Sequence, residues 1–222
     1  MKSFVLMLGA LLLAAATAGS SASRAAELPR VLILGDSISI GYTPFVKAGL
    51  KDVAEVIRPA ETCSGTTHGV AQLDKWLALG NGKWDVIHFN FGLHDLKRVN
   101  AATGAASRNP EDPRQAELPK YETQLTAITD RLKKTGARLI YAATTPVPAA
   151  KLNPHRDPED VVRYNAVAAR VMKERGVIVN DLYAFALPRL SEIQRPMNVH
   201  FTDAGSQALA AEVVSAIKKA LP

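Results

Sequence analysis

Residues 31–39 read Val31-Leu32-Ile33-Leu34-Gly35-Asp36-Ser37-Ile38-Ser39. The opening run of apolar residues predicts a short strand that is buried on both faces. Gly35 to Ser37 break that run, and a helix is expected soon afterwards, over about 42–50. A serine in the first turn after a buried parallel strand lies at the edge of the sheet where open α/β folds bind their ligands. Ser37 is therefore a candidate nucleophile, although serine and aspartate in such a turn also serve simply as helix caps.

The N-terminal 22 residues have the pattern of a secretory signal peptide. Lys2 precedes an apolar run over residues 4–16, and small residues follow it. We expect cleavage after Ala18 or Ala22 and export to the periplasm or the medium. A retained N-terminal anchor is the alternative, but the run is short for a membrane span, and no later apolar run is long enough for one.

The remaining chain, residues 28–222, is expected to form one domain, which is long enough to bury a core. Removal of Lys2 with the signal peptide lowers the formal net charge from +6 to +5. Basic and aromatic residues are dispersed, so no nucleic-acid partner is expected. The single cysteine, Cys63, cannot form an internal disulfide, which suits an exported bacterial protein with an ordinary core. The sequence does not indicate an oligomeric state.

Strand and helix patterns alternate along this domain. Strands are expected over about 30–34, 53–57, 85–91, 138–143 and 177–179, and helices over about 42–50, 70–79, 121–134, 157–174, 181–187 and 203–220. Alternation with short crossovers predicts an α/β three-layer sandwich, in which a parallel sheet of about five strands has helices on both faces.

A long polar stretch over residues 96–119 interrupts this alternation. A loop of that length in a compact domain is usually a functional lid or a mobile insertion. It carries four basic residues, Lys97, Arg98, Arg108 and Arg114. These side chains could meet an anionic substrate, but a solvated loop explains them equally well.

Polar clusters follow the first three strands at the carboxyl edge of the sheet. They are Gly35-Asp36-Ser37, Ser64-Gly65-Thr66 and Gly92-Leu93-His94-Asp95, and His200 lies just before the last helix. A serine hydrolase needs a nucleophile, a base and preorganised donors for an oxyanion. Ser37 can attack, His200 can accept its proton, and Gly65 lets a backbone N–H approach the substrate closely.

These four blocks, in this order, resemble those of the SGNH or GDSL hydrolases, and the resemblance spans about residues 32–216. It implies the flavodoxin-like SGNH fold and a serine esterase without a cofactor. Ser37 and His200 would be catalytic. Backbone N–H groups of Ser37 and Gly65, together with the side chain of His94, would form the oxyanion hole.

Two positions depart from the family pattern. His94 stands where the family carries an asparagine, and Met197 stands where it carries the acid of the triad, three residues before the histidine. Asn198 is one residue nearer and carries no charge, so we expect a Ser-His dyad in which a backbone carbonyl or the Asn198 side chain orients the ring. Asp181 is a further group to examine in that role.

The remaining polar residues of these blocks have structural interpretations. Asp36 belongs to the turn, Asp95 resembles a family residue that braces loops, and Asn90 is expected to be a structural amide. His68 and His155 are expected at the surface and His88 in the core. A zinc site built from His94, Asp95 and His200 has no closely spaced ligand pair to support it, so no metal is expected.

The leading interpretation is a secreted serine esterase acting on small acyl esters, with acetyl removal from a carbohydrate suggested by the family alone. A lipolytic enzyme or a thioesterase is the alternative within the same class. A flavodoxin-like cofactor binder would use the turn at 37–43 for a phosphate, but it leaves His200 without a role. A non-catalytic binding protein of the same fold is favoured by Met197 and His94. The acyl and leaving groups are not readable from the sequence.

Overall fold

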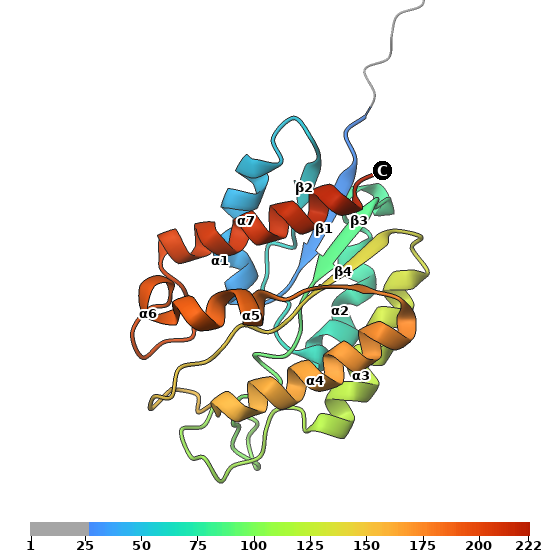
Figure 1. The fold of residues 1–222 in the computed structure, drawn as a ribbon. Helices are drawn as coiled ribbons and strands as arrows, with labels where there is room; N and C mark the ends of the chain where they lie inside the picture. Colours follow the sequence, from blue (N-terminus) through green and yellow to red (C-terminus); the bar gives the residue numbers. More distant parts are fainter. Residues whose placement is uncertain (1–26) are drawn as a thin grey trace, which may run out of the picture.

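The structure is a computed structural model that describes residues 27–222, so the predicted signal peptide lies outside the described residues. Five parallel strands form one sheet in the order β2-β1-β3-β4-β5, as Figure 1 shows. The strands are β1 (Arg30–Leu34), β2 (Glu55–Ile57), β3 (Val86–Phe89), β4 (Arg138–Ala142) and β5 (Ile178–Asn180). The predicted five-stranded parallel sheet is confirmed.

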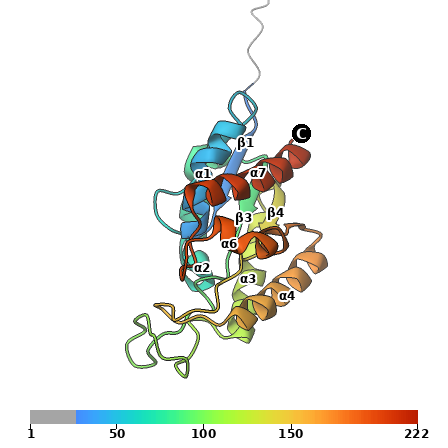
Figure 2. The same ribbon diagram turned by 60° about the vertical axis from the view of Figure 1, so that its left-hand side comes forward.

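Helices cover both faces of this sheet. The α-helices are α1 (Ser37–Gly49), α2 (Thr66–Leu77), α3 (Leu118–Lys133), α4 (Pro158–Arg175), α5 (Leu182–Ala186), α6 (Leu190–Ile193) and α7 (Asp203–Ala220), and two 3₁₀ turns are η1 (Leu79–Gly82) and η2 (Leu187–Arg189). Helices α1 and α7 pack against each other on one face, and α2, α3 and α4 pack side by side on the other (Figures 1 and 2). The three-layer α/β sandwich is thus confirmed. No helix in residues 27–222 combines the length and apolar character needed to cross a membrane.

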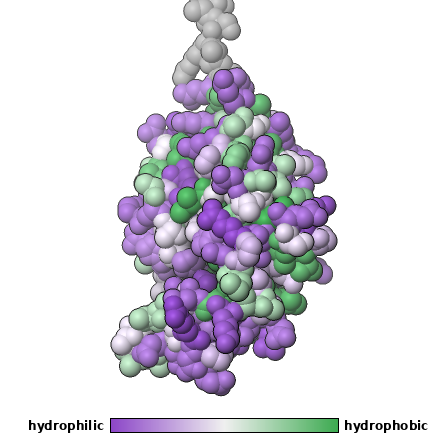
Figure 3. Space-filling model, turned by 90° about the vertical axis from the view of Figure 1, so that its left-hand side faces the viewer, coloured by the Kyte–Doolittle hydropathy of each residue, from purple (hydrophilic) through white to green (hydrophobic). Residues whose placement is uncertain are grey.

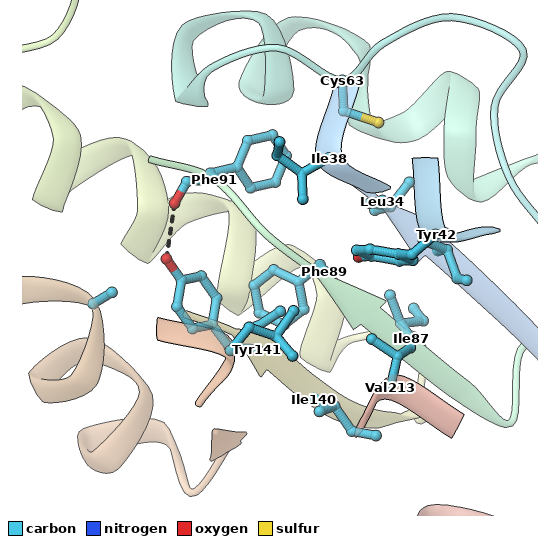
Figure 4. Packing of buried hydrophobic residues seen from close by; sticks show 14 of the residues in the cluster. Leu34, Ile38, Tyr42, Cys63, Ile87, Phe89, Phe91, Ile140, Tyr141 and Val213 are labelled. Atoms are coloured by element: carbon cyan, nitrogen blue, oxygen red, sulfur yellow. Dashed lines mark hydrogen bonds between the residues drawn. The ribbon is translucent and has the colours of Figure 1, made fainter. Parts of the chain in front are cut away.

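The first strand lies inside the sheet, between β2 and β3. Residues 31–34 are fully buried, because helices cover both of their faces. Figure 4 shows how side chains from both sides of the sheet, among them Leu34, Phe89 and Val213, join one hydrophobic core. The face seen in Figure 3 is instead mostly hydrophilic, with apolar residues scattered over it.

Helices α1 and α2 begin several residues earlier than the sequence pattern predicts, and α3 begins at Leu118 and not near residue 121. Helix α1 begins at Ser37 and not near residue 42, because the Asp36 carboxylate accepts a hydrogen bond from the Ile38 amide at 2.8 Å and caps the helix. Helix α2 begins at Thr66, four residues before the first apolar position of the predicted pattern. In both cases polar first-turn residues belong to the helix, and apolar periodicity does not detect them. The short helix α6 was not predicted.

Two buried tyrosine side chains fix the backbone just after the end of β3. The hydroxyl groups of Tyr121 and Tyr141 lie 2.9 and 2.8 Å from the carbonyl oxygen of Phe91 and donate to it, the second bond being drawn in Figure 4. Gly92 follows with a φ of 154°, and a Cβ atom there would collide with the hydroxyl of Thr144. Only glycine permits this turn, which leads directly to His94 and Asp95.

The segment between β3 and α3 projects from the carboxyl edge of the sheet (Figure 2), but it is tied to α4. Arg98 forms an ion pair with Asp157 at 2.5 Å. Arg114 binds both carboxylate oxygens of the buried Asp160, at 2.6 and 2.8 Å. Arg98 and Arg114 are therefore paired with acidic residues at the start of α4, and these ion pairs anchor the long segment.

Candidate active site

The candidate nucleophile occupies the first turn of α1. Ser37 is half-buried and follows Asp36, which is almost fully buried. Arg58 braces the same turn, because its guanidinium donates to the carbonyl oxygen of Gly35 at 3.1 Å. Burial raises the pKa of Asp36, while the Ile38 amide and the nearby charges of Arg156 and Arg58 oppose the shift. The turn thus holds the serine at a helix N-terminus, where backbone N–H groups point outward.

His200 reaches Ser37 from the opposite end of the chain. The distance between His200 Nε2 and Ser37 Oγ is 2.8 Å, which is a hydrogen bond. Thr202 caps α7 by accepting from the Gly205 amide at 3.0 Å, as predicted. The buried side chain of Gln194 donates to the carbonyl oxygens of Pro146 and Val199 and so fixes the loop before the histidine.

Asn198 orients the histidine ring. Its Oδ1 atom lies 2.7 Å from His200 Nδ1 and 2.9 Å from the backbone nitrogen of His200. Because that backbone N–H can only donate, Oδ1 must be the acceptor, and the Nδ1 that faces it carries the proton. Nε2 is then unprotonated and can accept the Ser37 proton. Of the two orienting groups considered from the sequence, the structure places the Asn198 side chain against the ring.

Met197, at the position where the family carries the acid of the triad, makes no hydrogen bond to His200. Met197 is 76% exposed and has a φ of 50°, and its apolar side chain cannot supply the hydrogen bond that Asn198 makes to the ring. Asp181 does not orient His200, because its carboxylate caps α5 by accepting from the Ala184 amide at 2.9 Å. The chain Ser37-His200-Asn198 therefore has the connectivity of a catalytic triad whose third member is neutral.

Burial, followed by the positive charges of Arg195 and Arg156, lowers the pKa of His200 below its ordinary value. A lower pKa keeps the imidazole unprotonated, and able to accept a proton, further into the acid range. The same positive charges oppose formation of the imidazolium during catalysis, and Asn198 offers no charge to offset them.

The three oxyanion-hole residues predicted from the sequence do not all lie at one surface. His94 lines the same cavity as Ser37, Asn198 and His200. Gly65 is buried at the start of α2 and does not line that cavity. A Cβ atom at Gly65 would lie 2.9 Å from the Asp95 carboxylate, so glycine is needed there for close packing. Ser37 and His94 thus share one cavity and Gly65 has a packing role, while the oxyanion roles of all three stay predictions.

His94 is a neutral donor. Burial, with the charges of Lys97 and Arg156 next in size, lowers the pKa of His94 to about 4. A neutral imidazole donates one N–H, which is what an oxyanion hole requires of the asparagine that the family carries there.

Asp95 and Asn90 brace the loops around the site. Asp95 Oδ1 accepts from the backbone amide and the hydroxyl of Thr66, at 2.8 and 2.6 Å, and so links the turn after β3 to the start of α2. Burial raises the pKa of Asp95 to about 6, against the lowering effect of these bonds. Asn90 donates to the carbonyl oxygen of Ala142 at 2.7 Å and links the ends of β3 and β4. Both residues have the structural roles expected of them.

The other histidines and the cysteine lie outside this arrangement. His88 is fully buried, and burial lowers its pKa to about 3. His68 packs against Trp76, whereas His155, expected to be exposed, is partly buried against Asp157 at 2.8 Å. Burial raises the pKa of Cys63 to about 11, so its thiol stays protonated. Residues 27–222 contain no group of three or more His, Cys, Asp or Glu side chains arranged to hold a metal ion.

Sequence reasoning missed Arg156, which contributes to the site from the loop before α4. Its Nε atom donates to the carbonyl oxygen of Leu93 at 2.9 Å, one residue before His94. One signal was available, because a cation directly before the helix cap at Asp157 opposes the helix dipole. Thr66, the partner of Asp95, belongs to the Ser64-Gly65-Thr66 cluster, and no role was predicted for it.

A buried parallel sheet with a serine-histidine pair at its carboxyl edge defines an α/β serine hydrolase. Residues 33–208, most of the chain, match the GDSL-like Lipase/Acylhydrolase family, and the chain belongs to that family. It is therefore a hydrolase that acts on ester bonds.

Solved structures of the same fold are similar to it at low sequence identity. A lipase/acylhydrolase from Enterococcus faecalis is 20% identical, with a TM-score of 0.71 over 88% of this chain and 98% of its own. An acetyl xylan esterase is 17% identical, with a TM-score of 0.66 over 85% of this chain and 99% of its own. An acetyl-xylooligosaccharide esterase from Geobacillus is 18% identical, with a TM-score of 0.64 over 86% and 94%. No curated protein matched the sequence.

We predict that Asn198 sets both the rate and the pH dependence. Asn198→Ala should lower kcat/KM by roughly 10²- to 10³-fold, less than the about 10⁴ lost when a charged orienter is neutralised in serine proteases. In Asn198→Asp a negative charge beside Nδ1 raises the pKa of His200, so the acid limb of the pH profile should move to higher pH. Met197→Asp should change little, because Nδ1 is already bonded. A large gain in kcat/KM for Met197→Asp would contradict the orienting role of Asn198.

We predict that His94 stabilises the oxyanion. His94→Ala should lower kcat by about 10²- to 10³-fold with little change in KM, because the bond forms mainly in the transition state. His94→Asn should recover much of that loss. Melting temperatures of the same samples serve as the control. Normal kcat with a lowered melting temperature in His94→Ala would mean that the residue only packs.

Proposed function

We propose that the protein is an exported serine esterase that removes small acyl groups, with Ser37 as nucleophile and His200 as general base. The hydrogen-bonded chain from Asn198 through His200 to Ser37 carries the proposal. Ser37 Oγ attacks the acyl carbon while its proton passes to His200 Nε2. The carbonyl oxygen becomes an oxyanion, which the His94 N–H and the Ser37 backbone N–H stabilise.

The second half of the reaction follows from the same atoms. The proton on His200 Nε2 is given to the leaving alcohol oxygen as the bond between that oxygen and the acyl carbon breaks. A water then attacks the acyl-serine, with His200 again accepting a proton, and Ser37 leaves with its hydroxyl restored. Acid, alcohol and free enzyme are the products, so no cofactor is required to balance the reaction.

Acetyl removal from a carbohydrate is the substrate class that we favour. The cavity beside Ser37, about 470 Å³ in volume, is lined by polar and charged residues as well as apolar ones. The charged side chains of Lys97 and Arg156 in this lining suit a polar alcohol part such as a sugar. Two structural neighbours described as esterases of acetylated xylan or xylooligosaccharide support the same direction.

The nucleophile can be tested by covalent labelling and by turnover. A fluorophosphonate should label the wild type but not Ser37→Ala, and Ser37→Ala should lose roughly 10⁴- to 10⁶-fold in p-nitrophenyl acetate hydrolysis. Ser215→Ala, an exposed serine of α7, is the matched control and should behave as wild type. Undiminished turnover in purified Ser37→Ala would reject the mechanism, and absence of labelling and of turnover in the wild type would favour a non-catalytic binding protein.

Export is part of the proposal and rests on the sequence pattern of the N-terminal 22 residues. Expression of the full chain in a bacterial host should yield a processed protein outside the cytoplasm that begins at Gly19 or Ser23. Edman sequencing of the fractionated protein is the measurement. An intact Met1 on a cytoplasmic product would count against export while leaving the esterase mechanism standing.

A further inference from the structure

The cavity beside Ser37 carries positive charge without acidic residues to balance it. Lys97, Arg156, His94 and His200 contribute to its lining, and no aspartate or glutamate does. His94 is neutral because burial lowers its pKa to about 4, and the pKa of His200 is also lowered. The net charge of the cavity therefore comes from Lys97 and Arg156.

Arg156 is held by hydrogen bonds but has no ion-pair partner among the described residues. Arg156 is buried, since only 7% of the residue is exposed. Its hydrogen bonds go to neutral carbonyl oxygens, from Nε to Leu93 at 2.9 Å and from Nη1 to Pro154 at 3.3 Å. Burial lowers the pKa of Arg156 to about 10, with Asp36 only partly opposing the shift. No described carboxylate lies within ion-pair distance of this guanidinium, and such a buried cation is costly without a partner.

Lys97, like Arg156, has no ion-pair partner among the described residues. It is half-buried, and burial followed by the repulsion from Arg156 lowers the pKa of its ammonium. Among the described residues no carboxylate forms an ion pair with it. Its neighbour Arg98 shows the contrast, because Arg98 is paired with Asp157. Of the four basic residues that the sequence offered as contacts for an anionic substrate, Lys97 is the one that lines the cavity.

We propose that Lys97 and Arg156 bind an anionic group, a carboxylate or a sulfate, on the alcohol part of the ester. This inference rests on the esterase function proposed above and names its substrate class, an acylated acidic sugar. An anion between the two cations would relieve their mutual repulsion and supply the charge that the protein omits.

Two features place the anion on the alcohol part of the substrate. The small acyl group needs little space, whereas a cavity of about 470 Å³ accommodates one or two sugar rings. The cavity also includes residues 197–200, so it lies beside the His200 imidazole, which protonates the leaving alcohol. The cavity wall is fixed in advance, because Arg98, the next residue after Lys97, and Arg114, further along the same segment, are tied to α4.

The test compares matched acetyl esters in the wild type and in variants. The substrates are acetylated methyl glucuronide, acetylated methyl glucoside 6-sulfate and acetylated methyl glucoside, which is neutral. We expect the wild type to favour at least one anionic ester in kcat/KM by about 10- to 100-fold, the effect of a charged hydrogen bond. The preference should fall as salt concentration rises. The two anionic esters distinguish carboxylate from sulfate.

Variants locate the preference in the cavity. Lys97→Met should reduce the ratio of kcat/KM for anionic esters to kcat/KM for the neutral ester by about tenfold. Arg156→Lys keeps the positive charge but loses the bidentate guanidinium, so it should reduce the ratio partially. Lys51→Met is the control, because Lys51 is an exposed lysine beyond the end of α1, at the opposite edge of the sheet. It should keep the wild-type ratio.

A binding experiment separates failure of this inference from failure of the proposed function. Titration of Ser37→Ala with methyl glucuronide, methyl glucoside 6-sulfate and methyl glucoside needs no catalysis, and at least one anionic glycoside should bind more tightly unless Lys97 is also replaced. Equal kcat/KM for all three esters, with Ser37-dependent hydrolysis intact, would overturn the anion site alone. Selective binding without hydrolysis of any ester would instead keep the anion site and reject the esterase.

Discussion

The hydrogen bond from the Ile38 amide to the Asp36 carboxylate decides where α1 begins, and the rest of the site depends on that point. With the helix starting at Ser37, the serine hydroxyl stands at the N-terminus of a helix, at the carboxyl edge of the sheet. To make this bond, the Asp36 carboxylate must be buried almost completely, which disfavours its ionised form. Arg58 and Arg156 make this burial tolerable, since their charges favour the ionised form of Asp36. Substrate recognition and nucleophile placement thus share one buried arginine.

A neutral orienting residue is consistent with this distribution of charge. In a triad with a carboxylate, the acid offsets the imidazolium that forms as the serine loses its proton. Here Asn198 fixes the tautomer without supplying charge, and Arg195 and Arg156 oppose the imidazolium. The base is therefore weaker, but it remains unprotonated at lower pH. An anionic substrate in the neighbouring cavity would supply part of the missing negative charge while it is bound. Binding of an anionic substrate would then also make His200 a stronger base.

The sequence was sufficient for the sheet, for the family and for the four polar blocks, because these depend on local patterns. The run at 31–34 and the glycine-bounded turns are short-range signals, and the structure places them as expected. Helix starts were predicted late, since the capping carboxylate at Asp36 and the first turn at Thr66 are polar. Arg156 could not be placed, because its contact with Leu93 spans 63 residues and depends on the path of two loops. Lys97 and Arg98 differ by one position, and only the fold separates the lysine that faces the cavity from the arginine paired to α4.

Helices α1 and α7 pack against each other and bring together residues from the two ends of the described chain. Ser37, Asn198 and His200, which form the hydrogen-bonded chain, lie just before or at the starts of these two helices. The groups assigned to recognition, Lys97 and Arg156, lie in the connections that precede α3 and α4. Changes in those connections that leave His94 and Arg156 in place can alter the substrate range without disturbing the hydrogen bonds that activate the serine. The fold in this way allows substrate preference to diverge among relatives while the reaction stays the same.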